Sequence, residues 1–252
     1  MASLFAGTTA SYARVRPPPS TAHSLLISPY GGLILVAPVS SRAHLEQVAT
    51  AVPTVVVGRH GSSPLYDTVT DDDIAGASLV VGHLAALGHR RIAHIEHHET
   101  DATRLTEMPN ARRAEGYRQA MRAHGLEESI DVVSTSYTQE GGYEAAKELL
   151  ARRRRPTAVF AGADIAAMGV LDAVAEAGLS VPGDLSVAGY DNTTFAAFGP
   201  ISLTSVDQGG HELGSDSARL LLERIADRSR PPVQVTLSPT LVPRRTTDRP
   251  PK

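Results

Sequence analysis

From Gly32 onward, short runs rich in Val, Ile and Leu alternate with segments whose apolar residues recur at helical spacing. Residues 32–37 and 53–58 are apolar enough for buried strands, and residues 42–50 between them have helical spacing. A strand, a helix and a second strand in succession form a βαβ unit, in which the two strands run parallel. This alternation restricts the chain to an α/β fold built on parallel sheets.

The same alternation continues to the end of the chain. An aspartate at or near Asp73 caps a helix that Gly88 ends. Further helices are predicted at residues 110–124, 139–151, 164–177 and 210–226. Strands are predicted at residues 91–95, 131–134, 156–161, 185–189 and 203–206, with late edge strands at 233–236 and 241–242. Two doubly wound α/β layers accommodate this set of elements.

The composition favours a soluble protein without disulfides or thiolate metal sites. The chain has 252 residues, 42% of them apolar, and no cysteine. No stretch approaches the roughly 20 apolar residues of a membrane span, and the N-terminus lacks a secretory signal pattern. A net charge of -3 gives no overall basic field, so this chain alone is not expected to bind nucleic acid. We expect a cytoplasmic protein with no membrane partner.

A series of short motifs runs along the chain. In order they are Gly32-Leu-Ile-Leu, Asp72-Asp73 with Gly76-Ala77, Gly88-His89-Arg90-Arg91-Ile92-Ala93, Arg113-Ala-Glu-Gly116-Tyr117, Pro156-Thr-Ala-Val-Phe-Ala with Asp164 and Ala167-Met168-Gly169, Gly178-Leu-Ser-Val-Pro-Gly-Asp-Leu-Ser-Val-Ala-Gly-Tyr-Asp191, Pro200-Ile-Ser-Leu-Thr204, Glu212-Leu-Gly214 and Leu241-Val-Pro-Arg244-Arg245-Thr246. Over residues 31–246 this ordered set resembles the effector-sensing part of LacI/GalR transcription regulators. The motif that ends at Asp191 is long enough to be specific.

The resemblance implies a fold of two lobes of the periplasmic-binding-protein-like type I, with a small-molecule effector between them. It also implies a homodimer, in which closure of the lobes controls binding to operator DNA. Members of the family begin with a helix-turn-helix headpiece, followed by a strand, a helix and a strand of the sensor, and the first thirty residues match none of these. We therefore expect an N-terminally truncated first lobe, and operator contact only through a headpiece absent from this chain.

The predicted domain organisation has a leader and two lobes. Residues 1–30 are an unassigned leader without sustained periodicity. The first lobe is predicted at residues 31–97 and 205–228, and the second at residues 98–204 and 229–247. The chain therefore crosses between the lobes near residues 97, 205 and 229.

Asp191 and Arg113 are the leading candidates for ligand binding. Asp191 follows a predicted strand, and ligands of open α/β sheets bind beyond the carboxyl ends of the strands. Arg113 lies in the first turn of a predicted helix, where the helix dipole disfavours a cation. The resemblance implies that the arginine projects into the cleft, where its planar fork binds an effector oxygen and the aspartate together. The alternatives are a turn aspartate and a solvated arginine, and solvation fits Arg112 better.

Three further residues are candidates. Tyr137 follows a predicted strand, where the family often places an aromatic platform for the effector ring, although it could be an ordinary tyrosine at the lobe edge. Asp164 begins a helix and could be an N-cap or a pocket residue. Phe198 and its neighbour Phe195 could line the cleft or pack in the core. Ala163 stands where sugar-binding members often carry an asparagine, so one polar effector contact is missing.

The sequence predicts no metal site, cofactor or catalytic residue. A cluster of His94, Glu96, His97, His98, Glu99 and Asp101 matches no zinc spacing, and a role beside the effector or in solvent is preferred. No phosphate-binding Gly-rich loop, G-x-S-x-G elbow or acid-base pair is found.

We therefore predict the effector-sensing and dimerisation part of a LacI-type regulator that binds a sugar-like or nucleoside-like molecule. The apolar helix at residues 164–177 is the candidate dimer contact. The alternative is a solute-binding protein for sugar uptake, which shares the fold but needs a secretory signal. A sugar-processing enzyme is a third hypothesis, and it lacks candidate catalytic groups.

Overall fold

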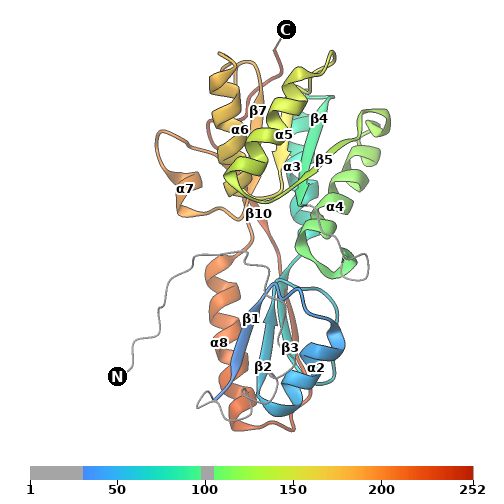
Figure 1. Cartoon of the computed structure of the whole chain (residues 1–252), viewed down its shortest axis with the longest axis vertical. Helices are drawn as coiled ribbons and strands as arrows, with labels where there is room; N and C mark the ends of the chain where they lie inside the picture. Colours follow the sequence, from blue (N-terminus) through green and yellow to red (C-terminus); the bar gives the residue numbers. More distant parts are fainter. Residues whose placement is uncertain (1–30, 98–104, 252) are drawn as a thin grey trace.

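The computed structural model describes residues 31–97 and 105–251, which form two α/β lobes around separate sheets (Figure 1). The predicted leader and residues 98–104 of the histidine-rich loop lie outside the described residues. The first lobe contains a four-stranded parallel sheet in the order β1-β2-β3-β9. Its strands are β1 (Leu33–Val36), β2 (Thr54–Val57), β3 (Asp67–Asp71) and β9 (Gln234–Leu237).

One helix covers each face of this sheet. Helix α2 (Arg42–Ala51) packs on the face that carries Val56, and α8 (Gly210–Ala226) packs on the face that carries Val55. Successive strand residues point to opposite faces, so a run of valines can contribute to both layers. Leu220 of α8 is fully buried against β2 and β3.

The second lobe contains a six-stranded sheet in the order β10-β8-β7-β6-β4-β5, with only β10 antiparallel to its neighbour. Its strands are β4 (Ile92–His97), β5 (Asp131–Thr135), β6 (Ala158–Ala161), β7 (Ser186–Tyr190), β8 (Thr204–Asp207) and β10 (Thr240–Val242). Its helices are α3 (Asp73–Leu87), α4 (Pro109–Ala123), α5 (Gln139–Ala151), α6 (Asp164–Glu176) and α7 (Thr194–Ala197), with short 3-10 helices at Leu105–Glu107 and Glu127–Ser129. The predicted α/β class is confirmed.

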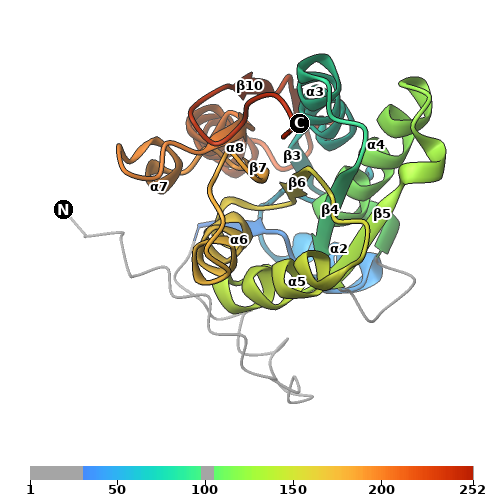
Figure 2. The ribbon, with the colours of Figure 1, turned by 90° about the horizontal axis from the view of Figure 1, so that it is seen from above.

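The helices of the second lobe form two layers. Figure 2 shows α3 and α4 on one side of the sheet and α5 and α6 on the other. Helix α3 ends at Gly88, whose φ of 106° gives the predicted left-handed cap. Helix α5 begins after Thr138, whose side chain accepts a hydrogen bond from the Gly141 N–H. Within the part of the chain that the structure describes, none of the helices has the length and apolar character needed to cross a bilayer.

Strand β3 was not predicted, because its sequence Asp-Thr-Val-Thr-Asp is polar. Every residue of β3 is nevertheless buried. Both of its aspartates have partners far away in the sequence: Asp67 accepts hydrogen bonds from Arg224 and Arg230, and Asp71 accepts one from Tyr190. Buried carboxylates are tolerated when such partners satisfy them, and these partners cannot be identified from local sequence.

The predicted lobe borders are wrong. Strand β4 was assigned to the first lobe, but it pairs with β5 and β6 in the second sheet. Strand β9 was assigned to the second lobe, but it pairs with β3 in the first. The chain therefore crosses between the lobes at Asp72, at residues 208–209 and at residues 238–239. The unrecognised β3 is the physical reason, because it completes the first sheet before α3 begins.

Candidate functional site

Arg113 and Asp191 lie together near the crossings between the lobes. The Nη1 atom of Arg113 is 3.3 Å from Oδ1 of Asp191, although 78 positions separate them in the sequence. Asp191 follows β7 directly and has a φ of 103°, a left-handed conformation that is strained for a residue with a side chain. Its N–H donates to the Val206 carbonyl in β8, which holds the turn in place. The predicted convergence is therefore present, while its role in ligand binding stays a prediction.

Protein groups hold the Arg113 guanidinium on several sides. It donates from Nε to Oδ1 of Asp73 at 2.7 Å and from Nη1 to the Gly162 carbonyl at 2.7 Å. Its Nη2 is 3.4 Å from the Gln208 side-chain oxygen, and its Cζ lies 3.7 Å from the centre of the Tyr190 ring. Burial alone would lower the pKa of Arg113, but the charges of Asp73 and Asp191 raise it well above its usual value. The guanidinium is therefore a fixed cation.

Asp73 and His60 belong to the site, and neither was predicted as a site residue. The N-cap of α3 is Asp72, whose side chain accepts from the Ala75 N–H, so Asp73 is free to face inward. Asp73 accepts from Arg113, and its Oδ2 lies 2.6 Å from Nε2 of His60. His60 lies in the loop after β2 of the first lobe, so this contact joins the two lobes. The sequence does contain a signal for this role, because residues 71–73 are all aspartates and a helix cap needs only one of them.

A third carboxylate, Asp71, extends the site toward the crossing. The Tyr190 hydroxyl donates to Oδ2 of Asp71 at 2.6 Å. Burial raises the pKa of Asp71, and the nearby charge of Asp73 raises it further. Burial also raises the pKa of Asp191 to about 7, against the lowering effect of Arg113. The carboxylates of Asp71, Asp73 and Asp191 surround the guanidinium of Arg113. The site therefore has more hydrogen-bond acceptors than this guanidinium can satisfy.

Tyr137 contributes a hydroxyl that has no hydrogen-bond partner in the described part of the chain. Its Oη is buried and makes no hydrogen bond to the residues that the structure describes. The charges of Arg113 and Asp191 both act on it, and burial raises its pKa. Its ring lies beside that of His97, with 5.2 Å between the centres. A buried hydroxyl without a partner is costly, so a ligand that pairs with it gains affinity. Its role as a platform stays a prediction.

Asp164 is already saturated by protein groups. Its Oδ1 accepts from the Ser205 hydroxyl at 2.6 Å, and its Oδ2 accepts from the Thr193 N–H at 2.7 Å and the Thr193 hydroxyl at 2.9 Å. These bonds fasten the loop after β7 to β8, so Asp164 positions the segment that carries Asp191. Phe198 follows α7 and is 61% exposed. Direct ligand contact by either residue stays a prediction.

His94 has a structural position. It is fully buried between the rings of Tyr117 and Phe160, and its Nδ1 donates to the Phe160 carbonyl. Burial lowers the pKa of His94 to about 3, so the ring is neutral at physiological pH. The predicted histidine-rich cluster also includes His98, Glu99 and Asp101, which lie outside the described residues.

Comparison with known proteins gives a family match and several relatives. A family model described as a periplasmic binding protein-like domain matches residues 81–247. The HTH-type transcriptional repressor PurR of Mannheimia succiniciproducens is 33% identical over 195 residues, which are 77% of this chain and 57% of the relative. The chain spans from 51% to 63% of the length of such curated relatives.

Two solved structures are also similar. A LacI transcriptional regulator from a Rhodococcus species has a TM-score of 0.84 and 33% identity, over 92% of this chain and 83% of its own. A LacI family transcriptional regulator from Enterococcus faecium, solved with bound ribose, has a TM-score of 0.75 and 31% identity, over 87% of this chain and 80% of its own.

Proposed function

Because the chain belongs to the periplasmic binding protein-like domain family, we propose that it is the effector-sensing part of a LacI-type transcription regulator. The observation that carries this proposal is the pairing of Arg113 with Asp191 beside the crossings between the lobes. Both side chains lie beyond the carboxyl ends of strands, where α/β sheets bind ligands. The unpaired hydroxyl of Tyr137 supplies a further group for a ligand.

The effector that fits this site is uncharged and rich in hydrogen-bond donors. Asp71, Asp73 and Asp191 offer acceptor oxygens, and their combined charge opposes an anion. Sugar hydroxyls and nucleoside N–H groups are suitable donors. The bound ribose in the Enterococcus faecium regulator supports a sugar-like effector. We assign the site to sugars or nucleosides without a phosphate group.

Effector binding acts by changing the relative position of the lobes. His60 of the first lobe contacts Asp73 of the second, and Asp71 at the end of β3 contacts Tyr190 in β7. A ligand that inserts between these groups favours one arrangement of the lobes over another. In a LacI-type regulator this bias reaches operator DNA through a headpiece. Such a protein acts in the cytoplasm and catalyses no reaction, so turnover of a bound sugar would contradict the proposal.

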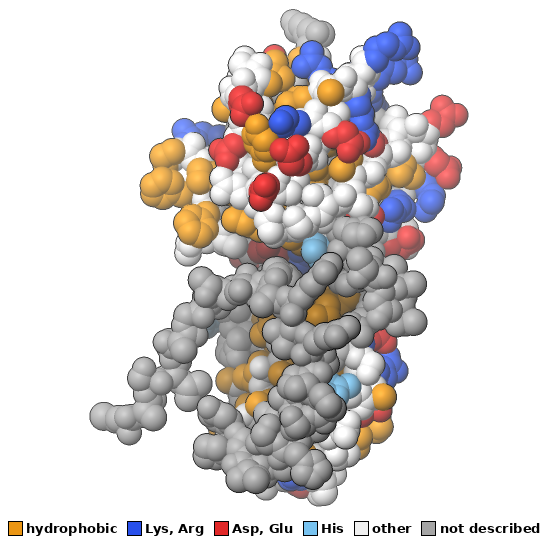
Figure 3. Space-filling view, viewed as in Figure 1, with side chains coloured by type: hydrophobic (Ala, Val, Ile, Leu, Met, Phe, Trp, Pro, Cys, Tyr) orange, Lys and Arg blue, Asp and Glu red, His pale blue; other side chains and the backbone are white. Residues whose placement is uncertain are grey.

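We further propose that the chain forms a homodimer through the second lobe. Ile165 of α6 is 46% exposed, and Phe195 and Phe198 at α7 are 66% and 61% exposed. Figure 3 shows hydrophobic side chains gathered over α7, at the left of the upper lobe. Exposed apolar groups of this kind mark protein interfaces. A lac repressor of similar structure is described as dimeric, which supports the assignment. Sedimentation that finds only monomers at tens of micromolar would contradict it.

A thermal-shift screen of neutral sugars and nucleosides tests the effector site. A ligand at 100 times its dissociation constant stabilises the folded state by about 2.7 kcal/mol, which raises the melting temperature by several degrees. The shift should be much smaller for Asp191→Asn and unchanged for Asp216→Asn, which alters a partly exposed aspartate of α8. An equal shift in the wild type and Asp191→Asn would exclude the proposed site.

A further inference from the structure

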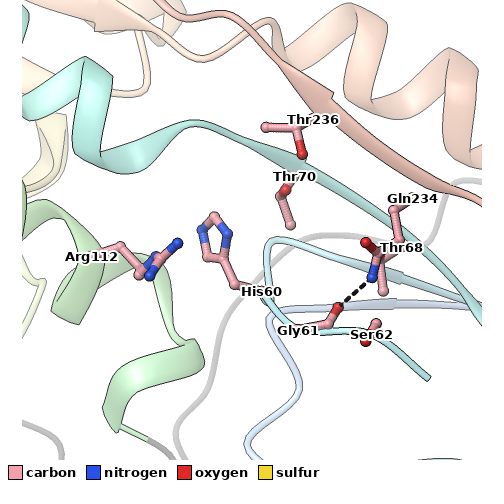
Figure 4. A pocket seen from close by; sticks show the side chains of 8 residues that line it. All are labelled: His60, Gly61, Ser62, Thr68, Thr70, Arg112, Gln234 and Thr236. Atoms are coloured by element: carbon pink, nitrogen blue, oxygen red, sulfur yellow. Dashed lines mark hydrogen bonds between the residues drawn. The ribbon is translucent and has the colours of Figure 1, made fainter.

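A second pocket, of about 250 Å³, lies between α4 of the second lobe and the paired strands β3 and β9 of the first (Figure 4). The loop at residues 60–62 forms another side. His60 lines this pocket and also contacts Asp73, so the pocket adjoins the proposed effector site without including Arg113 or Asp191.

The pocket contains a cation, Arg112, that has no side-chain partner among the described residues. Arg112 has no side-chain hydrogen bond or ion pair to any of the described residues, and its Nε is buried. Figure 4 shows its side chain reaching from α4 toward His60. Its neighbour Arg113, by contrast, donates to Asp73, Gly162, Asp191 and Gln208. A partly buried guanidinium with unused donors is costly, and an oxyanion would satisfy it.

The opposite wall adds neutral donors. Thr68 pairs with Gln234 and Thr70 with Thr236 in the register of β3 and β9, so these four side chains share one face of the sheet. The three threonine hydroxyls make no hydrogen bond within residues 31–97 and 105–251, and the Gln234 amide donates to the Gly61 carbonyl. None of the lining residues is acidic. Hydroxyls beside an arginine form a set of donors suited to phosphate oxygens.

Two carboxylates that contact the surroundings of the pocket, Asp73 and Glu107, have partners of their own. Asp73 contacts both Arg113 and His60. On the other side of the loop, Glu107 forms ion pairs with Arg42 and Arg59. Arg112 is therefore the charged side chain that lines the pocket itself, while these two carboxylates contact other residues.

We propose that this pocket is a second binding site, for phosphate or a small phosphate ester, and that it is separate from the effector site. The guanidinium of Arg112 and the hydroxyls of Thr70 and Thr236 bind the oxyanion. Because Arg112 belongs to the second lobe and the threonines to the first, the bound anion bridges the lobes and couples to their closure.

Isothermal titration with inorganic phosphate and with glycerol phosphate tests this site, at constant ionic strength in chloride buffer. Wild-type protein should show saturable binding of at least one of the two, and comparison of the two distinguishes free phosphate from an ester. Arg112→Gln should weaken binding at least about tenfold, because a hydrogen bond to a charged group is lost. Thr236→Val should also weaken it about tenfold or more, because the hydroxyl donates to a charged oxyanion.

The control variants separate this site from other effects. Arg122→Gln, on the exposed side of α4, should bind as the wild type does. Arg112→Gln should also keep the wild-type melting temperature without phosphate, because Arg112 has no side-chain partner among the described residues. Asp191→Asn should bind phosphate normally, so this proposal can hold even if the effector site is wrong. Equal binding by the wild type and Arg112→Gln, absence of saturable binding, or loss of binding in Asp191→Asn would overturn it.

Discussion

Replacing Asp67 with alanine should destabilise the first lobe strongly. Asp67 is fully buried and accepts from Nε and Nη2 of Arg224 at 2.7 and 2.8 Å, from Arg230 at 2.7 Å and from the Val233 N–H at 2.7 Å. The alanine variant leaves Arg224, whose side chain is 5% exposed, as a buried charge without this partner. Hydrogen bonds to charged groups are worth about 1.5–3 kcal/mol each and are not additive, and breaking a buried ion pair costs about 3–5 kcal/mol. We expect a loss of about 3–5 kcal/mol in the free energy of unfolding.

Urea unfolding followed by circular dichroism measures this loss. The matched control is Asp216→Ala, which removes an ion pair to Arg219 on the exposed side of α8, where the side chains are 30% and 51% exposed. Surface pairs of this kind contribute about 1 kcal/mol or less. If Asp67→Ala loses no more stability than Asp216→Ala, the buried charges do not hold β3 in the sheet, and our explanation of this polar strand fails.

Three further predictions concern the site. Effector affinity should rise about tenfold between pH 6 and pH 8 in calorimetry, because the pKa of Asp191 is about 7 and its ionised form is the better acceptor. Tyr190→Phe should lower the free energy of unfolding by about 1–3 kcal/mol in urea, since Asp71 loses its buried donor. Gly162→Ala should weaken effector binding in the thermal-shift assay with little loss of stability, because the new Cβ would clash with the Tyr137 hydroxyl and displace that ring.

Each of these predictions has a control. The affinity of Asp191→Asn should not vary with pH over this range, and an equal pH dependence in this variant would assign the titration to another group. Tyr143→Phe removes a hydroxyl that donates to Glu176 on the surface, and it should change stability little. Gly214→Ala, in the exposed part of α8 with open space around it, should be neutral or slightly stabilising. A similar loss of binding in Gly162→Ala and Gly214→Ala would refute the steric argument.

Local signals predicted most of the regular structure. Residues 139–151 and 210–226 were predicted as helices, and they form α5 and α8 with the same bounds. These segments have helical spacing and lie between residues that start or end helices. The two late strands were predicted at sheet edges, and both are edge strands. The ordered motifs also predicted the resemblance to LacI/GalR regulators, which the relatives and solved structures confirm.

The missed strand and the wrong lobe borders have one physical origin: buried charged side chains whose partners are distant in the sequence. Strand β3 lacks an apolar pattern because Arg224 and Tyr190, more than a hundred positions away, satisfy its aspartates. Without β3, the first lobe border was placed too late, at residue 97, and β9 had no recognised partner strand in the first sheet. Strand pairing depends on tertiary contacts. Hydrophobic periodicity therefore cannot predict a strand whose residues are polar.

The site was predicted in part for the same reason. Strand-end position and helix position pointed to Asp191 and Arg113, and the resemblance to LacI/GalR regulators implied that both face the cleft. The inward role of Asp73 was missed because any of three aspartates could cap α3, and only the folded chain shows that Asp72 does so. His60 gave no local signal, since its role depends on contact between the two lobes.

Calorimetry on Asp191→Ala, with the sugar or nucleoside that gives the largest thermal shift, tests the central claim most directly. Asp191 lies beside Arg113, and a hydrogen bond to a charged group is worth about 1.5–3 kcal/mol. We therefore predict that affinity falls about ten- to two-hundred-fold while the fold is retained. Arg113→Ala should cause a similar loss, and the double variant should lose less than the sum of the two single losses. If Asp191→Ala binds the ligand as the wild type does, the pair is not the effector site.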